Sequence, residues 1–218
     1  MKFLDGLDND IKQALLAQLR NLWTHTSTAI EGNTLTLGET AFVIEKGLTV
    51  SGKPLKDHEE MVGHAKAIDL NYELVKRSEK VTEQDLFKLH KAIQTERIAD
   101  ICKPVGAWKV EENGTYAVNE SEQQLFLEYA RPADVPQLMA KWLACFNELC
   151  SSICDKKAAI SVYTELHVSF VCIHPFFDGN GRLARLLANL PVLKSGFPPI
   201  VIEKENDGNI FEYFRVMN

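Results

Sequence analysis

The stretch His174-Pro-Phe-Phe-Asp-Gly-Asn-Gly-Arg-Leu-Ala-Arg185 groups a histidine, a carboxylate, a glycine-rich turn and two arginines within a single short segment. Pro175 disfavours helical dihedrals in the residue before it, so the apolar helix that leads into the stretch is expected to end there. The glycines of Asp178-Gly-Asn-Gly181 favour a turn that lets a ligand approach the backbone. A further helix is predicted over 182–194. A glycine turn that opens a helix presents unpaired N–H groups and the positive end of the helix dipole, so the stretch predicts a phosphate-binding loop.

Two arginines in this stretch, Arg182 and Arg185, lie three positions apart and therefore share one face of the predicted helix. Arginine in a first helical turn is unfavourable beside the positive end of the dipole, so both side chains are expected to contact anions. The formal net charge of −6 argues against a nucleic-acid partner. A nucleotide is therefore the expected source of the phosphate.

The size and composition of the chain are those of one globular domain: 218 residues, 45% hydrophobic and 25% charged, without a repeat or a long linker. No apolar run approaches the roughly 18 residues of a membrane-spanning helix, so no membrane partner is predicted. The five cysteines form no C-x-x-C pair, and an odd count fits free thiols. We therefore expect a soluble, cytoplasmic protein with a single domain over 1–218.

Apolar residues at helical spacing, with capping residues and glycine stops between them, predict a mostly α-helical fold. Asp57 and Glu60 give the start signal of one of these helices, and residues 157–173 should form the most buried one. His90 and His167 lie on apolar helix faces, where a hydrogen-bonded core histidine is favoured over a catalytic one. Besides 182–194, helices are expected over 10–31, 36–45, 57–76, 82–94, 136–149, 157–173 and 209–216.

One segment departs from the helical pattern. Residues Trp108 to Val118 alternate around Asn113-Gly114, a dipeptide that favours a tight hairpin turn. The sequence therefore predicts a β-hairpin over about 106–119. Because an isolated hairpin is only marginally stable, it must pack on the helices or bind a partner.

The carboxylate of Glu31 falls in the last turn of the first predicted helix, which Gly32 is expected to stop. A negative charge there opposes the helix dipole unless a cation compensates it. Ser27 lies one turn earlier on the same face, where its hydroxyl could bond the carboxylate. The position of Glu31 therefore predicts a cationic partner, the alternative being a solvated helix end.

The opening stretch resembles the motif of the Fic (filamentation induced by cAMP) family, H-x-F-x-D/E-G-N-G-R-x-x-R, and matches it at every specified position. Ser27-Thr-Ala-Ile-Glu31-Gly32 resembles the inhibitory motif S/T-x-x-x-E-G/N of the subgroup with an N-terminal inhibitory helix. The resemblance covers about 20–205. It implies a Fic-type helical bundle with one β-hairpin flap, an inhibitory helix at about 10–31 and a catalytic loop at 174–185.

The resemblance also implies a reaction, the transfer of AMP from ATP to a serine, threonine or tyrosine hydroxyl of a target protein. His174 would take the hydroxyl proton, and a histidine that titrates near neutrality suits a general base. Asp178 would bind Mg²⁺ as a hard oxygen ligand. Phe176 would anchor the loop in the core.

Phosphate binding is assigned by the same resemblance to the start of the helix. The backbone N–H groups of Gly179, Asn180 and Gly181 would surround the transferred phosphoryl group. Arg182 and Arg185 would form forked hydrogen bonds with phosphate oxygens, as lysine could not.

A brake on this reaction is implied as well. Glu31 would pair with Arg185 and occupy the place of the ATP γ-phosphate, so the chain would be autoinhibited. The same carboxylate could instead orient a water that hydrolyses AMP from a modified protein. The sequence leaves both roles open.

The predicted hairpin lies where the family has a flap that docks the target by strand pairing. Its candidate docking residues are Trp108, Val110, Tyr116 and Val118. Trp108-Lys109 stands where the family pattern has Tyr-Arg, which leaves the choice of target open. A hairpin that only packs against the helices is the alternative.

The leading interpretation is an autoinhibited protein adenylyltransferase that uses ATP and Mg²⁺ and acts on a target protein. Within enzymes, the alternatives are an AMP-protein hydrolase and a transferase of another phosphate-containing moiety. Outside enzymes, the alternative is a regulatory module that senses ATP without turnover. A pure binder needs no base, so the presence of His174 argues against that last class. A homo-oligomer is compatible with the sequence.

Overall fold

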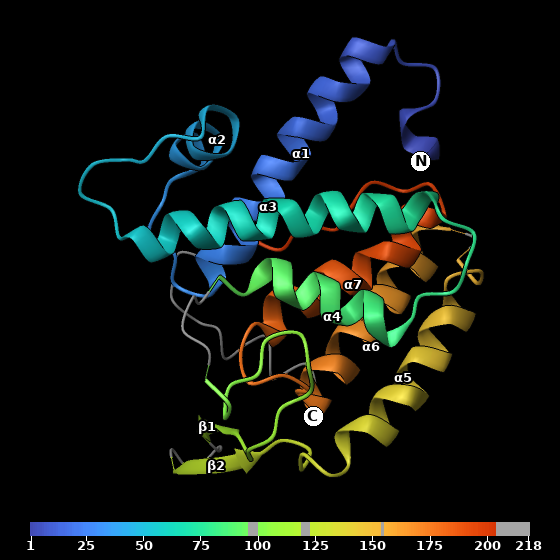
Figure 1. Cartoon of the computed structure of the whole chain (residues 1–218). Helices are drawn as coiled ribbons and strands as arrows, with labels where there is room; N and C mark the ends of the chain where they lie inside the picture. The colour runs from blue at the N-terminus through green and yellow to red at the C-terminus, as the bar shows by residue number, and fades with distance from the viewer. Residues whose placement is uncertain (96–99, 119–122, 154, 204–218) are drawn as a thin grey trace.

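The computed structural model describes residues 1–95, 100–118, 123–153 and 155–203, which form a mostly α-helical bundle with one β-hairpin (Figure 1). The predicted fold class is confirmed, while the helix predicted over 209–216 lies outside the described residues. In chain order the elements are a 3-10 turn Lys2–Leu4, α1 Asn9–Ile30, α2 Leu37–Lys46, α3 Leu55–Lys76, α4 Glu83–Ile93, β1 Gly114–Val118, β2 Gln124–Glu128, α5 Val135–Leu149, α6 Lys156–Ile173 and α7 Asn180–Lys194.

Capping within one helical turn explains the boundaries that the sequence predicts well. At the start of α2, the Thr36 hydroxyl accepts a hydrogen bond from Glu39 N at 3.3 Å, and the Glu39 carboxylate accepts one from Thr36 N at 2.8 Å. The helix ends at Gly47, whose φ of 66° is left-handed. Thr82 and Asp85 form the equivalent capping box of α4. Such caps use residues three positions apart, so their signature is visible in the sequence.

The start of α3 is a correction to the sequence analysis. The helix begins at Leu55, two residues before the predicted start. The Asp57 carboxylate accepts hydrogen bonds from Thr34 N at 2.9 Å and Thr34 Oγ1 at 2.6 Å, so it binds another segment and does not cap its own helix. Glu60 likewise faces Asn33, at 3.0 Å. The predicted cap is wrong because the carboxylates of Asp57 and Glu60 both bind residues of the segment that follows α1.

The β-hairpin is present, but the predicted position is wrong. β1 pairs antiparallel with β2, with Gly114 opposite Glu128 and Val118 opposite Gln124. Asn113-Gly114 therefore stands at the open end of the hairpin, and the strands are joined through 119–123, of which 119–122 are outside the described residues. The Asn113 side chain is held by a tertiary contact, because its Nδ2 donates to Phe176 O at 3.3 Å.

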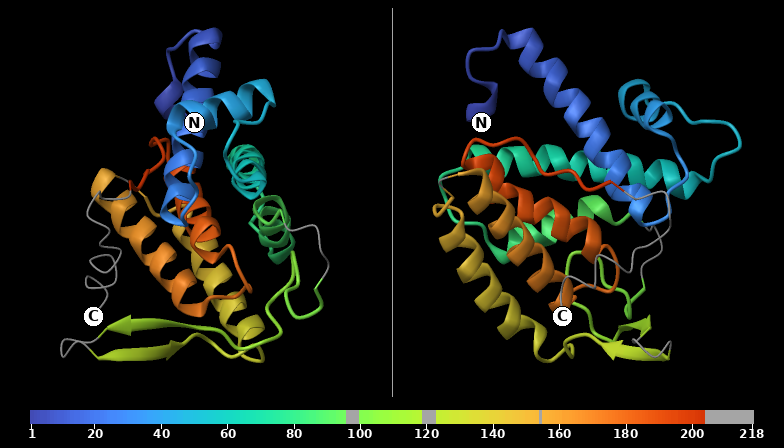
Figure 2. Two further views of the ribbon diagram at one scale, coloured as in Figure 1. Left: turned by 90° about the vertical axis from the view of Figure 1, so that its left-hand side faces the viewer. Right: turned by 180° about the vertical axis from the view of Figure 1, so that it is seen from behind.

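Helix α7 forms the centre of the bundle, with α3 on one side, α6 on the other and α5 outside α6 (Figures 1 and 2). Every residue from Leu183 to Leu193 is buried, so α7, and not the predicted 157–173 helix, is the most buried one. The sequence of α7 hides this because Arg182, Arg185 and Asn189 are buried together with its apolar residues. The start of α7 is thereby fixed in the middle of the molecule.

None of the described helices combines the length and the apolar character needed to cross a bilayer. Four cysteines lie within the described ranges, and all four are free thiols, as the sequence predicts.

Candidate functional site

Two left-handed residues fix the loop between α6 and α7. His174 caps α6 with φ 52° and ψ 60°, and its N–H donates to Phe170 O at 3.0 Å. Within the described ranges it is the only non-glycine residue with positive φ. Gly179 caps the start of α7 with φ 76°. Left-handed backbone at a non-glycine residue costs on the order of 1–2 kcal/mol, so the surrounding contacts must hold His174 in place.

The imidazole of His174 is oriented from two sides. Its Nδ1 lies 3.3 Å from Val171 O, and because a carbonyl only accepts, Nδ1 carries the proton and Nε2 is left as an acceptor. The ring stacks on Tyr129 with 3.8 Å between centroids and 4° between planes. Burial lowers the pKa of His174 to about 4. The expected near-neutral titration is therefore wrong for this state of the chain, in which the ring is neutral at pH 7.

Phe176 anchors the loop in the core, as predicted, and is fully buried. Its ring stacks on His90 with 4.0 Å between centroids. The Asn180 side chain closes the loop on itself, because Oδ1 accepts from Phe176 N at 3.0 Å and Nδ2 donates to Phe176 O at 2.8 Å. Asn180 therefore contributes a side-chain clamp in addition to the backbone N–H group predicted for it.

His90 is a hydrogen-bonded core histidine, as predicted, but its contacts serve the loop. Gly106 N donates to its Nδ1 at 2.8 Å, so the opposite nitrogen, Nε2, donates to Asp178 O at 3.1 Å. Burial lowers the pKa of His90 to about 4, which keeps the ring neutral at pH 7. The sequence separation of 88 residues between His90 and Asp178 hides this role from sequence analysis.

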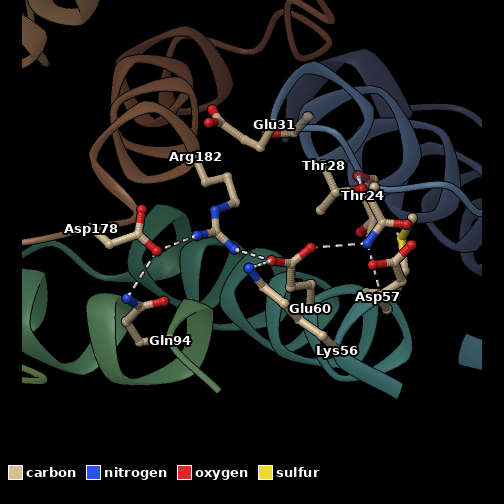
Figure 3. Close-up of polar contacts among 12 residues, drawn as sticks. Thr24, Thr28, Glu31, Lys56, Asp57, Glu60, Gln94, Asp178 and Arg182 are labelled. Carbon is tan, nitrogen blue, oxygen red and sulfur yellow. Dashed lines mark hydrogen bonds and ion pairs between the residues drawn. The ribbon is translucent and has the colours of Figure 1, made fainter. Parts of the chain in front are cut away.

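A chain of polar contacts joins Asp178 to Arg182 and continues to Glu60 (Figure 3). Asp178 Oδ2 accepts from Arg182 Nη2 at 3.2 Å and from Gln94 Nε2 at 3.1 Å. Arg182 Nη1 lies 3.6 Å from Glu60 Oε1. The pKa of the Asp178 carboxyl is lowered: burial opposes this, and the Arg182 charge and hydrogen bonds from Gly179 N and Gln94 outweigh it. Asp178 is therefore a carboxylate at pH 7, and it shares Arg182 with Glu60.

The predicted pair of Glu31 and Arg185 is present in the structure. Arg185 Nη2 donates to Glu31 Oε1 at 2.6 Å and to Ser27 O at 2.8 Å, and Arg185 Nε donates to Ser27 Oγ at 2.9 Å. The Ser27 hydroxyl, expected to bond Glu31, therefore binds the arginine. A Cβ added to Gly181 would lie 2.5 Å from Glu31 Oε1, so the carboxylate rests on the first turn of α7. The cation that Glu31 requires is Arg185 of α7, and the positive end of the α7 dipole lies beside the same carboxylate.

The predicted flap residues divide into two groups. Trp108 is half-buried, with its ring 4.6 Å from that of Phe87 and 5.0 Å from that of Phe176, so it supports the loop. Val110 and Tyr116 are exposed, and Tyr116 packs on Phe126 across the hairpin. The side chain of Val118 is outside the described part of the chain.

Sequence reasoning missed a buried lysine beside the loop. Lys109 is 2% exposed, its N–H donates to Pro175 O at 2.9 Å, and its Nζ donates to Asn113 Oδ1 at 2.5 Å. Burial lowers the pKa of Lys109 to about 8. The departure of Trp108-Lys109 from the family pattern was the available signal. Tyr129, Gln94 and Glu60 gave none, because each meets the loop from a distant part of the chain.

A carboxylate that could face a metal ion is present at Asp178, whose side chain is 55% exposed. Two of the hydrogen bonds to this carboxylate, from Arg182 and Gln94, use Oδ2. No group of three or more histidine, cysteine, aspartate or glutamate side chains that could hold a metal occurs among the described residues. The protein fits a cation as a single carboxylate ligand, which suits an ion held mainly by phosphates and water.

Comparisons with known proteins agree with this arrangement. The family model of the Fic/DOC family matches residues 80–192. Protein adenylyltransferase Fic of Nematostella vectensis is 34% identical over 194 residues, which cover 88% of this chain and 42% of the relative. Protein adenylyltransferase fic-1 of Caenorhabditis briggsae is 33% identical over 203 residues, which cover 90% of this chain and 36% of the relative. The chain thus spans less than half the length of these relatives.

Solved structures show the same fold. A Fic domain-containing signalling protein from Bacteroides thetaiotaomicron superposes with a TM-score of 0.82 at 28% identity, over 97% of this chain and 76% of the other. A fragment of Fic-1 from C. elegans gives a TM-score of 0.76 at 27% identity, over 99% and 60%. The family model covers more than half of the chain and includes the whole loop from His174 to Arg185. The chain belongs to the Fic/DOC family.

Proposed function

We propose that the chain is an autoinhibited protein adenylyltransferase, which transfers AMP from ATP to a serine, threonine or tyrosine hydroxyl of a target protein. One observation carries the proposal. A neutral His174, with Nε2 as an acceptor, lies in the loop that leads directly into the buried helix α7, and the first turn of α7 is already in contact with an anion, the Glu31 carboxylate. The names of the curated relatives support the same activity. A base beside an anion site is the arrangement that nucleotidyl transfer to a hydroxyl requires.

The reaction can be written on the residues of the loop. Nε2 of His174 accepts the proton of the target hydroxyl, whose oxygen forms a bond to the α-phosphorus of ATP. The bond from that phosphorus to the bridging oxygen breaks, and pyrophosphate leaves with the electron pair. The N–H groups of Gly179, Asn180 and Gly181 and the guanidinium of Arg182 stabilise the charge on the transferred group. A bound Mg²⁺, with Asp178 as its protein ligand, would supply neutralisation of phosphate charge.

Inhibition follows from the place of the Glu31 carboxylate. It lies on the first turn of α7 and pairs with Arg185, where a phosphate would otherwise bind the same guanidinium. A phosphate at this place would meet the Glu31 carboxylate at close range and be repelled by its like charge. ATP can therefore bind productively only after the end of α1 moves, which makes the pair a two-state gate.

The test is self-labelling with α-labelled ATP. The Glu31→Gly variant should label at least roughly tenfold faster than wild type, because the competing anion is gone. Adding His174→Ala should abolish this labelling. The matched control is Glu79→Gly, which removes an exposed carboxylate in the connection between α3 and α4 and should label as wild type. Label that persists without His174 would exclude the assigned base.

The same preparations separate the alternatives. Release of AMP from a labelled protein by wild type, but not by Glu31→Gly, would identify hydrolysis as the net activity. Affinity for ATP without labelling in any variant would identify a nucleotide sensor. Labelling by another α-labelled nucleotide in preference to ATP would overturn the choice of AMP as the transferred group.

A further inference from the structure

We propose that Glu60 is a positioning residue that couples Arg182 to the segment carrying Glu31. Under the proposed function, Arg182 belongs to the phosphate site and Glu31 to the gate, and the pair of Glu31 with Arg185 does not involve Glu60. The inference rests on the proposed function and concerns how the gate senses the nucleotide.

Glu60 is a buried carboxylate with partners on both sides. Its side chain is 11% exposed and faces Arg182, which is 5% exposed, across 3.6 Å. Oε1 also lies 3.7 Å from Lys56 Nζ, whereas Oε2 accepts a hydrogen bond from Asn33 Nδ2 at 3.0 Å. Figure 3 shows Glu60 between the Asp178–Arg182 pair and the end of α1. A carboxylate this buried is stabilised by its partners, so the movement of one partner changes the strength of the contacts that Glu60 makes with the others.

Asn33 follows the gate residue by two positions and fixes the chain that leaves α1. Its Nδ2 also donates to Asp57 O at 3.0 Å, and its Oδ1 accepts from Leu35 N at 3.1 Å. The N–H of Asn33 donates to Thr28 O at 3.1 Å, which ties it to the last turn of the helix. Displacement of the Asn33 side chain therefore acts on the backbone next to Glu31.

Arg182 is the element of this network that a nucleotide would change. In the structure its two terminal nitrogens face two carboxylates, Asp178 at 3.2 Å and Glu60 at 3.6 Å. A phosphate that binds Arg182 adds a third anion and weakens the attraction of the guanidinium for Glu60. Glu60 accepts a hydrogen bond from Asn33 with its other oxygen, so a weaker attraction between Arg182 and Glu60 also changes the contact that holds the segment next to Glu31. Binding at Arg182 and opening at Glu31 are therefore coupled through one carboxylate.

A set of variants tests this coupling through labelling by α-labelled ATP. Asn33→Asp places a carboxylate against Glu60 and should increase labelling roughly fivefold or more over wild type, because the segment is released. Glu60→Gln should also increase it. The combination of Asn33→Asp with Glu60→Gln restores a donor–acceptor pair of reversed direction, so it should label closer to wild type than either single variant. If the double variant labels as fast as the faster single variant, or faster, the inference is overturned. That result is expected when each substitution only destabilises the fold, because the two effects would then add.

The Glu31→Gly background separates this inference from the proposed function. There the gate is absent, so Asn33→Asp should leave labelling unchanged, whereas Glu60→Gln should raise the KM for ATP several-fold with little change in kcat, because Arg182 loses a support. If Glu31→Gly itself fails to label, the proposed function is wrong. If it labels but Asn33→Asp changes labelling equally in both backgrounds, the coupling through Glu60 is wrong and the function stands.

Discussion

At the scale of single residues, His174, the proposed base, is held by contacts that take no part in proton transfer. His174 has a left-handed backbone, and its ring lies flat on Tyr129. Tyr129 is itself fixed at the end of the hairpin, because its N–H donates to Asn113 O at 3.1 Å. The hairpin therefore helps to orient the ring of His174.

Tyr129 should be replaceable by a flat ring but not by an aliphatic side chain. In the Glu31→Gly background, Tyr129→Leu is expected to lower kcat for labelling at least about tenfold, because a small displacement of a catalytic group is costly. Tyr129→Phe keeps the stacked ring and should retain most of the activity. The comparison is made by initial labelling rates at saturating ATP. Equal losses in the two variants would show that the hydroxyl, and not the ring, matters.

At the scale of elements, the principal contact lies between the end of α1 and the start of α7. The Glu31 carboxylate would otherwise face the negative end of its own helix, yet it sits at the positive end of another. Gly181 makes this approach possible, since any side chain there would meet the carboxylate. Two helices thus meet end to end through one acid and one glycine.

Gly181→Ala should test this contact through stability. The added Cβ would lie 2.5 Å from Glu31 Oε1, so the carboxylate must move away. We expect the substitution to cost roughly 1 kcal/mol more in wild type than in Glu31→Gly, where that oxygen is absent. Urea unfolding of the four proteins of this cycle measures the difference. If Gly181→Ala lowers the free energy of unfolding equally in both backgrounds, the Glu31 carboxylate and position 181 are not energetically coupled.

The elements also show where sequence analysis succeeds and where it stops. Thr36 and Gly47 delimit α2 correctly because both act within one turn of their own helix. Asn113-Gly114 carries the same kind of local signal, but Lys109 and Phe176 use the Asn113 side chain, so the turn forms elsewhere.

The candidate site divides in the same way. The twelve-residue motif could be predicted from the spacing of its own residues. For Glu31, the helix end predicts only a cationic partner, and the choice of Arg185 comes from the resemblance to the Fic family. The support of Asp178 by Gln94 and His90 could not be predicted, because 84 and 88 residues separate the partners. Buried contacts of this kind depend on how helices pack, which local pattern does not determine.

At the scale of the whole molecule, burial of neutral histidines makes the fold sensitive to acid. His64 is fully buried, and burial lowers its pKa well below the usual value. Burial lowers the pKa of His167 to about 4. Each folded pKa lies below that of the unfolded chain, near 6.5, so the unfolded chain binds protons more readily. Their contribution to stability is complete above pH 6.5 and is lost as the pH falls towards 4.

The free energy of unfolding should therefore decrease between pH 7.5 and pH 5.0. For His167 the expected loss at pH 5.0 is on the order of 2 kcal/mol, since about 1.4 kcal/mol corresponds to one pKa unit. In His167→Gln this part of the decrease should be absent. Urea titrations of both proteins at the two pH values provide the measurement. A decrease of the same size in the variant would assign the acid sensitivity to other groups.

The contact between Arg185 and the end of α1 joins residues that are 158 and 154 positions apart in the chain. During synthesis the segment that contains Ser27 and Glu31 leaves the ribosome long before the loop that contains His174 does. Under the proposed function, the inhibitor is thus already made when the catalytic loop emerges. In a nascent chain, Glu31 would be available to pair with Arg185 as soon as the catalytic loop folds, and no active precursor would accumulate during translation.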